Sequence, residues 1–235
     1  MPAVVARGRP PAVIACGYCH RADGSGGPEN ATLTGLSADY MTRQVADFRS
    51  GARTGSEPLR LPTATMAAVV RAATDSEVAI AVRYFAAQRY TRHLAVIESD
   101  SAPAVRISGW LLVTTDGPWE PIGQRIVEVP DDTHQFERRD ASASRTAWVP
   151  PGSVARGKAI VATMNCTTCH GPALQGLDPA PAIAGRSPTY LMRQLYDFKA
   201  GTRAGAMSAP MKVVTEQLSL DDMIAVAAYI ASLDP

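Results

Sequence analysis

Two short motifs contain the residues of this sequence whose types and spacing could do chemistry. Each has two cysteines separated by two residues and followed at once by a histidine: Cys16-Gly-Tyr-Cys19-His20 and Cys166-Thr-Thr-Cys169-His170. C-x-x-C-H is the attachment signature of c-type haem. On a helical turn the two thiols can reach the vinyl groups of one porphyrin, and the imidazole then lies beneath the iron. The pattern predicts two covalently attached haems c, with His20 and His170 as proximal iron ligands.

Three other uses of paired cysteines compete with haem attachment. A zinc site built from two C-x-x-C pairs usually has about 15–20 residues between them, whereas 146 residues separate Cys19 from Cys166. A thioredoxin-like redox motif is single and lies in a βαβ pattern, which this sequence lacks. Two structural disulfides are compatible with a secreted chain. The histidine that follows each pair favours haem attachment over all three.

The two motifs open two similar segments of the chain. Residues 40–55 overlay residues 190–205 at an offset of 150, and eight of the sixteen positions are identical. After this segment the offset becomes 145, because the first copy has five extra residues near Ser56–Thr65. Two copies indicate a tandem duplication of one small domain rather than a solenoid.

Each copy has the pattern of a mainly helical domain. Apolar residues recur at helical spacing over residues 40–50 and 190–200, and a glycine follows each run. Residues 75–88 and 219–233 begin with acids in the first turn, after the predicted N-caps Thr74 and Ser219. A short helix is expected over residues 157–164. Its counterpart before Cys16 contains Pro10-Pro11, so we expect that helix to be shortened or missing.

The duplication narrows the search for a sixth iron ligand among eight methionines. A thioether is a common distal ligand of haem iron in electron carriers. Only Met66 and Met211 match each other between the copies, each eight residues before the final helix cap. Both lie in proline-containing stretches that we expect to be irregular. We predict Met66 and Met211 as distal ligands, with Met207 as the reserve for the second haem; His93 and His134 lie outside the copies and are expected to have ordinary surface or core roles.

A connector of about 60 residues, 92–152, separates the two copies. It contains all three tryptophans and six arginines against nine acids, so its formal charge is −3 within a chain of net charge +1. Residues 104–115 and 124–129 alternate like strands, with Asp116-Gly-Pro as turn chemistry between them. We expect a small β-hairpin here, which acts either as a brace between the domains or as a docking surface for a redox partner.

The motifs together resemble class I cytochrome c, in the tandem diheme form of the c-four type. The likeness covers about residues 8–91 and 153–235. It implies a mainly α fold with two haem domains, residues 1–91 and 153–235, joined by the connector 92–152. It also implies His/Met ligation, with His20 paired with Met66 and His170 with Met211.

The resemblance also implies contacts around each haem. In that family a proline carbonyl accepts a hydrogen bond from the proximal histidine, and Pro181 fits this role. The first copy has Ala31-Thr-Leu-Thr-Gly35 at the matching place, with no proline, so only a backbone carbonyl is available there. The paired arginines Arg43/Arg193 and Arg53/Arg203 have either a role with haem propionates or an ordinary place on an exposed helix face.

The expected function is single-electron transfer between redox proteins, such as a dehydrogenase donor and an oxidase or cytochrome acceptor. One alternative is the cytochrome subunit of a flavin- or quinone-dependent dehydrogenase complex. Another is a diheme enzyme, a peroxidase or sulfur-compound dehydrogenase, which needs an open distal position. Formal charge near zero argues against a nucleic-acid partner, and no apolar run has the roughly 18 residues of a membrane helix, although association with a membrane complex stays open.

The resemblance implies a periplasmic protein, because haem attachment to C-x-x-C-H in bacteria takes place outside the inner membrane. The first ten residues contain no apolar signal-peptide core. We therefore expect either that a signal segment has been removed or that the start is mis-assigned.

Overall fold

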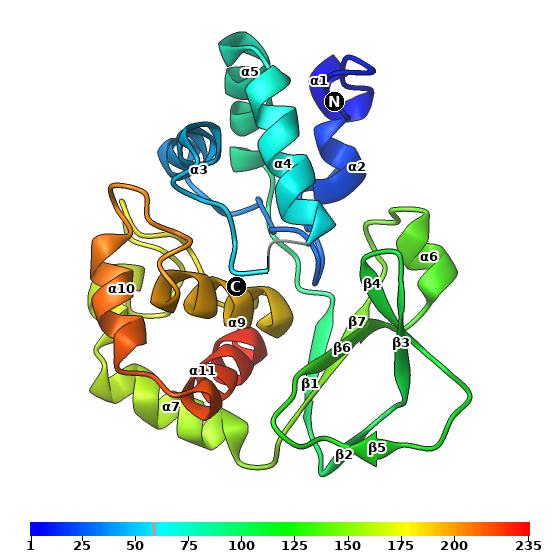
Figure 1. Cartoon of the computed structure of the whole chain (residues 1–235), viewed down its shortest axis with the longest axis vertical. Helices are drawn as coiled ribbons and strands as arrows, with labels where there is room; N and C mark the ends of the chain where they lie inside the picture. Colours follow the sequence, from blue (N-terminus) through cyan, green and yellow to red (C-terminus); the bar gives the residue numbers. More distant parts are fainter. Residues whose placement is uncertain (58–59) are drawn as a thin grey trace.

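A computed structural model describes residues 1–57 and 60–235 as two helical parts with a β-rich segment beside them (Figure 1). The helices of the first part are α1 Ala3–Ala6, α2 Cys16–His20, α3 Ala38–Ser50, α4 Leu61–Ala72 and α5 Asp75–Ala86. Those of the second part are α7 Ser153–Thr163, α8 Cys166–His170, α9 Pro188–Lys199, α10 Ala209–Glu216 and α11 Leu220–Ser232. The order of helices is therefore repeated, as expected for a duplicated domain.

Local sequence signals set the ends of the longer helices. The Ser37 hydroxyl accepts a hydrogen bond from the Tyr40 N–H before α3, and Gly51, at φ +81°, ends the helix in the left-handed region. Capping boxes at Thr74 and Ser219 open α5 and α11 and confirm the predicted starts of both helices. Helix α1 has four residues, which agrees with the expected shortening before the first motif.

Helices α7 and α11 cross in the core of the second part at Gly157. A Cβ atom at this position would overlap the carbonyl oxygen of Ala225 and approach the Cβ atom of Tyr229 to 2.7 Å. The buried side of α11 packs with Val161 and Leu174 in the same cluster. Close helix contact at a glycine therefore sets the geometry of this part.

We expect Gly157→Ala to destabilise the protein by about 2 kcal/mol, because the added methyl overpacks the crossing by more than alanine gains in helix propensity. Denaturant unfolding followed by far-UV circular dichroism measures the change. Ala159→Ser, on the exposed face of α7, is the control and should shift stability by less than about 0.5 kcal/mol. An unchanged midpoint for Gly157→Ala would show that the two helices separate easily.

The connector forms a small β-rich unit. Strand β1, Leu94–Glu98, runs parallel to β7, Arg145–Val149, and β6, Val127–Pro130, pairs antiparallel with β7 on its other side. The other described elements are the hairpin of β3 Val105–Ser108 with β4 Leu111–Thr114, the antiparallel pair of β2 Ser101–Ala102 with β5 Glu120–Pro121 on either side of it in the chain, and the short helix α6 Thr133–Glu137. One sheet face packs through Leu94 and Ala147 against Ala231 of α11.

The observed hairpin lies at another place in the chain than the predicted one. Residues 105–114 form a hairpin by themselves, with Gly109 at φ +60° in its turn. The prediction of a hairpin turn at Asp116-Gly-Pro was therefore wrong. Strand β6 pairs with β7 instead. Local alternation identified the strand-forming segments, but it carries no information about a pairing with a strand some 18 residues away.

Glu128 links the connector to the second helical part through an ion pair and two hydrogen bonds. Its side chain is fully buried and lies 3.6 Å from the guanidinium of Arg145. The other carboxylate oxygen accepts hydrogen bonds from the Ser187 hydroxyl, at 2.6 Å, and the Thr189 N–H, at 3.2 Å, at the start of α9. Because a buried carboxylate needs such partners, the start of α9 and the sheet are held together.

The repeated segment itself forms the contact between the two helical parts. Backbone N–H groups of Thr54 and Ala204 donate across the contact to Thr202 and Ala52, at 2.9 and 2.7 Å. Arg53 and Arg203, which occupy equivalent positions in the two copies, each donate hydrogen bonds to the other helical part. Arg53 donates to Tyr190 and Gln194, while Arg203 donates to their counterparts Tyr40 and Gln44.

A second pair of arginines also donates hydrogen bonds between the two helical parts. Arg43 donates to the carbonyl of Pro179 at 3.0 Å, and Arg193 donates to the carbonyl of Pro28. These four arginines thus bridge the two parts rather than lie on an exposed helix face. Within the described ranges, every helix is too short or too polar to cross a membrane.

Candidate functional site

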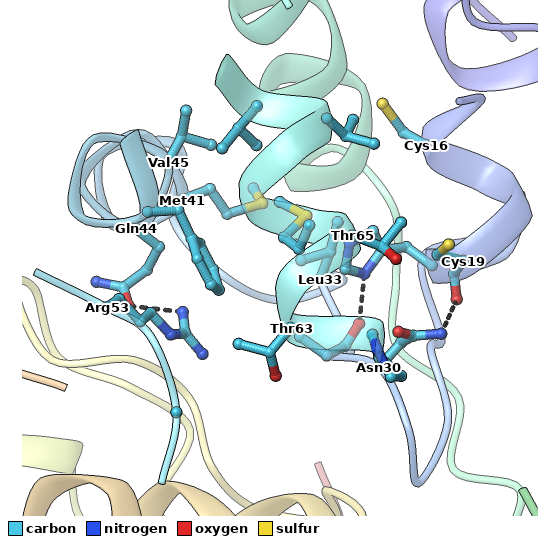
Figure 2. A pocket seen from close by; sticks show the side chains of 18 of the residues that line it. Cys16, Cys19, Asn30, Leu33, Met41, Gln44, Val45, Arg53, Thr63 and Thr65 are labelled. Carbon is cyan, nitrogen blue, oxygen red and sulfur yellow. Dashed lines mark hydrogen bonds between the residues drawn. The ribbon is translucent and has the colours of Figure 1, made fainter. Parts of the chain in front are cut away.

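A cavity of about 420 Å³ opens beside the first motif, lined by residues of α2, α3, α4 and α5 and by residues of α9 from the second helical part. Figure 2 shows Cys16 and Cys19 on the α2 side of this cavity and Met41, Gln44 and Val45 on the α3 side. Its lining is mostly apolar, and its size lies in the range of about 300–1,000 Å³ that is typical of ligand pockets. Both cysteines are free thiols in the structure.

His20 is buried at the end of α2 and also lines the cavity. Its Nδ1 atom is 2.8 Å from the carbonyl oxygen of Ala31, so Nδ1 carries the proton and donates it. The other ring nitrogen, Nε2, keeps a lone pair for a metal. Burial lowers the pKa of His20, against the hydrogen bond to Ala31, and this favours the neutral imidazole that ligates iron.

The second motif repeats this arrangement. His170 is buried, and its Nδ1 atom donates to the carbonyl of Pro181 at 2.8 Å, which confirms the contact expected for Pro181. Burial again lowers the histidine pKa. Cys166 and Cys169 are free thiols, and Cys169 is exposed. The Ala31 carbonyl plays the same part in the first site without a proline, because the acceptor is a backbone group that every residue has.

Both predicted methionines lie on helices, so the expectation of irregular segments was wrong. Met66 belongs to α4 and lines the cavity together with His20, while Met211 is partly buried in α10. Pro62 and Pro210 stand in the first turn of these helices, where the missing proline N–H would have no helical partner anyway. They mark helix starts rather than loops. Met207 precedes α10 and is 55% exposed.

The structure also places residues that the motif analysis did not single out around the cavity. Met41, Glu29, Arg60 and Trp110 all line it, Trp110 from the tip of the β3–β4 hairpin. The two remaining histidines belong to the connector: His93 directly precedes β1, and His134 is exposed on α6. The sequence around Cys16 and Cys19 does not predict that Trp110 lines the cavity, because a contact between distant parts of the chain brings Trp110 to it. Among residues 1–57 and 60–235, no three His, Cys, Asp or Glu side chains gather in a way that could hold a metal ion.

Arg21 joins the first motif to the connector. It adopts φ +64° directly after His20, where the second motif has Gly171 at φ +85°. A side chain in this region costs about 1–3 kcal/mol of backbone strain. The guanidinium lies 4.1 Å from the ring centre of Phe136 in α6 and donates to the carbonyl of Asp140. These contacts offset the backbone strain at Arg21 and hold α6 against the first site.

Comparison with known proteins gives a family for this architecture. A family model described as cytochrome c matches residues 154–234. Cytochrome c-554(548) of Halomonas halodenitrificans is 37% identical over 82 residues, which cover 34% of this chain and 96% of that protein.

The chain belongs to the cytochrome c family.

Two longer matches extend the likeness of this cytochrome to both helical parts. A thiosulfate dehydrogenase electron acceptor of Stutzerimonas stutzeri (strain A1501) is 29% identical, covering 96% of this chain and 82% of the relative. Cytochrome c4 of Pseudomonas aeruginosa is 26% identical, covering 93% and 83%. The chain is a cytochrome of the c4 type, and its role is electron transfer with covalently bound haem c.

Solved structures share the fold of this cytochrome. Cytochrome c4 from Pseudomonas stutzeri has a TM-score of 0.60 at 20% identity, covering 93% of both chains. Thiosulfate dehydrogenase from Marichromatium purpuratum has a TM-score of 0.65 at 24% identity, covering 99% of this chain. The cytochrome spans 39% of the length of that second structure.

The first cavity of the cytochrome suits haem c in its charge as well as in its mostly apolar lining. The guanidinium groups of Arg53, Arg60 and Arg193 line it and suit the two propionate carboxylates of a haem. Burial and the nearby charge of Arg60 lower the pKa of Arg193 to about 10. Buried cations that repel one another in this way are stabilised by carboxylates placed between them.

Proposed function

We propose that the protein is a periplasmic electron carrier with two His/Met-ligated haems, in domains 1–91 and 153–235. Cys16 and Cys19 form the thioethers of haem 1, and Cys166 and Cys169 those of haem 2. His20 and His170 are the proximal ligands, and Met66 and Met211 the distal ligands. The observation that carries the proposal is a buried imidazole with a fixed proton on Nδ1, in one apolar cavity with two free thiols and a thioether.

Each group of residues has a distinct part in this function. The haem iron supplies the chemistry, which is the uptake and release of one electron. The Ala31 and Pro181 carbonyls hold the imidazole rings in one orientation, so that their Nε2 atoms stay in place when the charge changes. The apolar lining excludes water, and a thioether on the distal side favours the ferrous state.

The optical spectrum of the purified protein tests this proposal. We expect two haems per chain, both low-spin, with the methionine-to-iron band present and no binding of carbon monoxide by the native protein. A high-spin fraction or ready uptake of carbon monoxide would indicate an open iron and favour the diheme enzyme instead.

The names of two relatives support a second, narrower proposal for the partner. Both are thiosulfate dehydrogenase electron acceptors. We infer that a dehydrogenase of this kind reduces the present cytochrome, either as a freely diffusing donor or within a stable complex. Stopped-flow mixing of oxidised cytochrome with a thiosulfate dehydrogenase and thiosulfate measures the rate. Reduction no faster than by thiosulfate alone would exclude this donor.

A further inference from the structure

The first haem site contains a buried carboxylate at a position where the second copy has a proline. Glu29 lines the cavity, and its side chain is only 2% exposed. The neighbouring residues Asn30 and Ala31 contact Cys19 and His20, with distances of 3.1 Å from the Asn30 amide to the Cys19 carbonyl and 2.8 Å from the Ala31 carbonyl to His20. Glu29 is therefore two residues away from the contact that orients the proximal histidine.

The connector supplies the counter-charge for this carboxylate. One guanidinium nitrogen of Arg139, just after α6, lies 3.6 Å from Oε1 of Glu29. Arg139 also lies over the ring of Tyr18 at 4.9 Å, so its position is defined from two sides. Arg21 and Arg145 also act on Glu29, and so do Arg60 and Arg193, which line the cavity. Burial raises the pKa of Glu29, while the charges of Arg145, Arg139 and Arg21 oppose this shift and stabilise the ionised carboxylate.

The arrangement is asymmetric about the carboxylate. Among the described residues, Arg21, Arg139 and Arg145 are not part of the cavity lining, whereas Glu29 is. Oε2 of Glu29 is buried and has no hydrogen-bond partner within that part of the chain. Glu29 thus lines the cavity together with Arg60 and Arg193, while the guanidinium groups of the other three arginines lie outside this lining.

The second site has no match for Glu29. The residue at the same offset is Pro179, and the adjacent Asp178 has a side chain that is 65% exposed. Water screens an exposed carboxylate strongly, while a buried one acts at a low effective dielectric. The two sites therefore differ in electrostatics although they share the same ligand pattern.

We propose that Glu29 lowers the reduction potential of haem 1. A buried negative charge stabilises the ferric state, which has one more positive charge than the ferrous state. This inference rests on the proposed function, because it needs a haem in each site.

Potentiometric titration of the holoprotein and of Glu29→Gln tests the proposal. The two haems are distinguished by their proton NMR signals, since haem 1 alone has Trp110 beside it. In Glu29→Gln we expect the potential of haem 1 to rise, so that the equilibrium constant for passing an electron from haem 1 to haem 2 falls about tenfold, which is 59 mV for a one-electron couple. Asp178→Asn is the matched control and should leave both potentials in place.

Two further variants exclude a merely structural effect. Glu29→Asp keeps the charge and should keep the potential of haem 1 near that of the wild type. Glu29→Leu replaces the carboxylate with an apolar side chain and should raise the potential of haem 1 as Glu29→Gln does. It therefore also tests the proposal if Glu29→Gln attaches haem poorly. Unchanged potentials in both neutral variants, or a shift confined to haem 2, would overturn the proposal. A wild type without two low-spin haems would instead contradict the proposed function.

Discussion

Met66→Ala should open the iron of haem 1 and leave haem 2 intact. Without the thioether of Met66 we expect the distal position of the first site to be open, and the control below tests Met41, whose thioether also lines the cavity. One of the two haems should therefore become high-spin in the oxidised protein and bind carbon monoxide after reduction. Optical titration with carbon monoxide, with haem quantified per chain, measures the fraction that reacts.

Met41→Leu is the matched control for this experiment. Met41 also lines the cavity, and the second helical part has Leu191 at the corresponding position, so leucine should be accommodated. The control should keep the methionine-to-iron band and bind no carbon monoxide. The opposite pair of results, with Met66→Ala unchanged and Met41→Leu open, would assign the distal position to α3 instead of α4.

Arg203→Met should loosen the contact between the two helical parts and destabilise the protein by about 3 kcal/mol. Arg203 is 7% exposed and donates to Gln194, Tyr40 and Gln44 at 3.0, 2.7 and 2.9 Å. A hydrogen bond from a charged donor contributes about 1.5–3 kcal/mol, and losing this donor strands buried oxygen atoms. Denaturant unfolding followed by haem absorbance and by circular dichroism measures the loss.

The unfolding curve also tells whether docking or a single part is affected. If the reciprocal arginines hold the parts together, the variant should unfold in two separated steps, while the wild type unfolds in one. Arg106→Met, at an exposed position of β3, serves as the control and should stay within about 0.5 kcal/mol of the wild type. A loss of stability without any broadening of the transition would place the role of Arg203 inside the second part.

The sequence predicts the helical framework well because its signals are local. The caps at Thr74 and Ser219 and the glycine after residue 50 lie within a few residues of the ends they determine. The duplication adds a second, independent copy of each signal. The connector was harder to predict, because its sheet joins strands about 50 residues apart, and no local pattern encodes the pairing of β1 with β7.

The motifs likewise predict where haem would be attached but not what surrounds it. The proline in the first turn of α4 was interpreted as a sign of irregular structure, although proline is compatible with a helix start. Trp110 and Arg139 reach the first site from the connector, and only tertiary packing brings them there. The sequence does contain a signal for the backbone conformation of Arg21. The second motif has Gly171 at the equivalent position, and a glycine there indicates a positive φ, which both residues adopt.

The parallel pairing of β1 with β7 has a mechanical consequence. The chain leaves the first helical part into the start of β1 and enters the second from the end of β7, and these ends lie at opposite ends of one five-residue ladder. A force that pulls the two parts away from each other therefore loads this ladder in shear, so its hydrogen bonds resist together instead of opening one after another. Despite its length, the connector therefore acts as a short and stiff link between the two helical parts. The separation of the two sites depends on the ladder of β1 with β7 and not on the length of the loops between these strands.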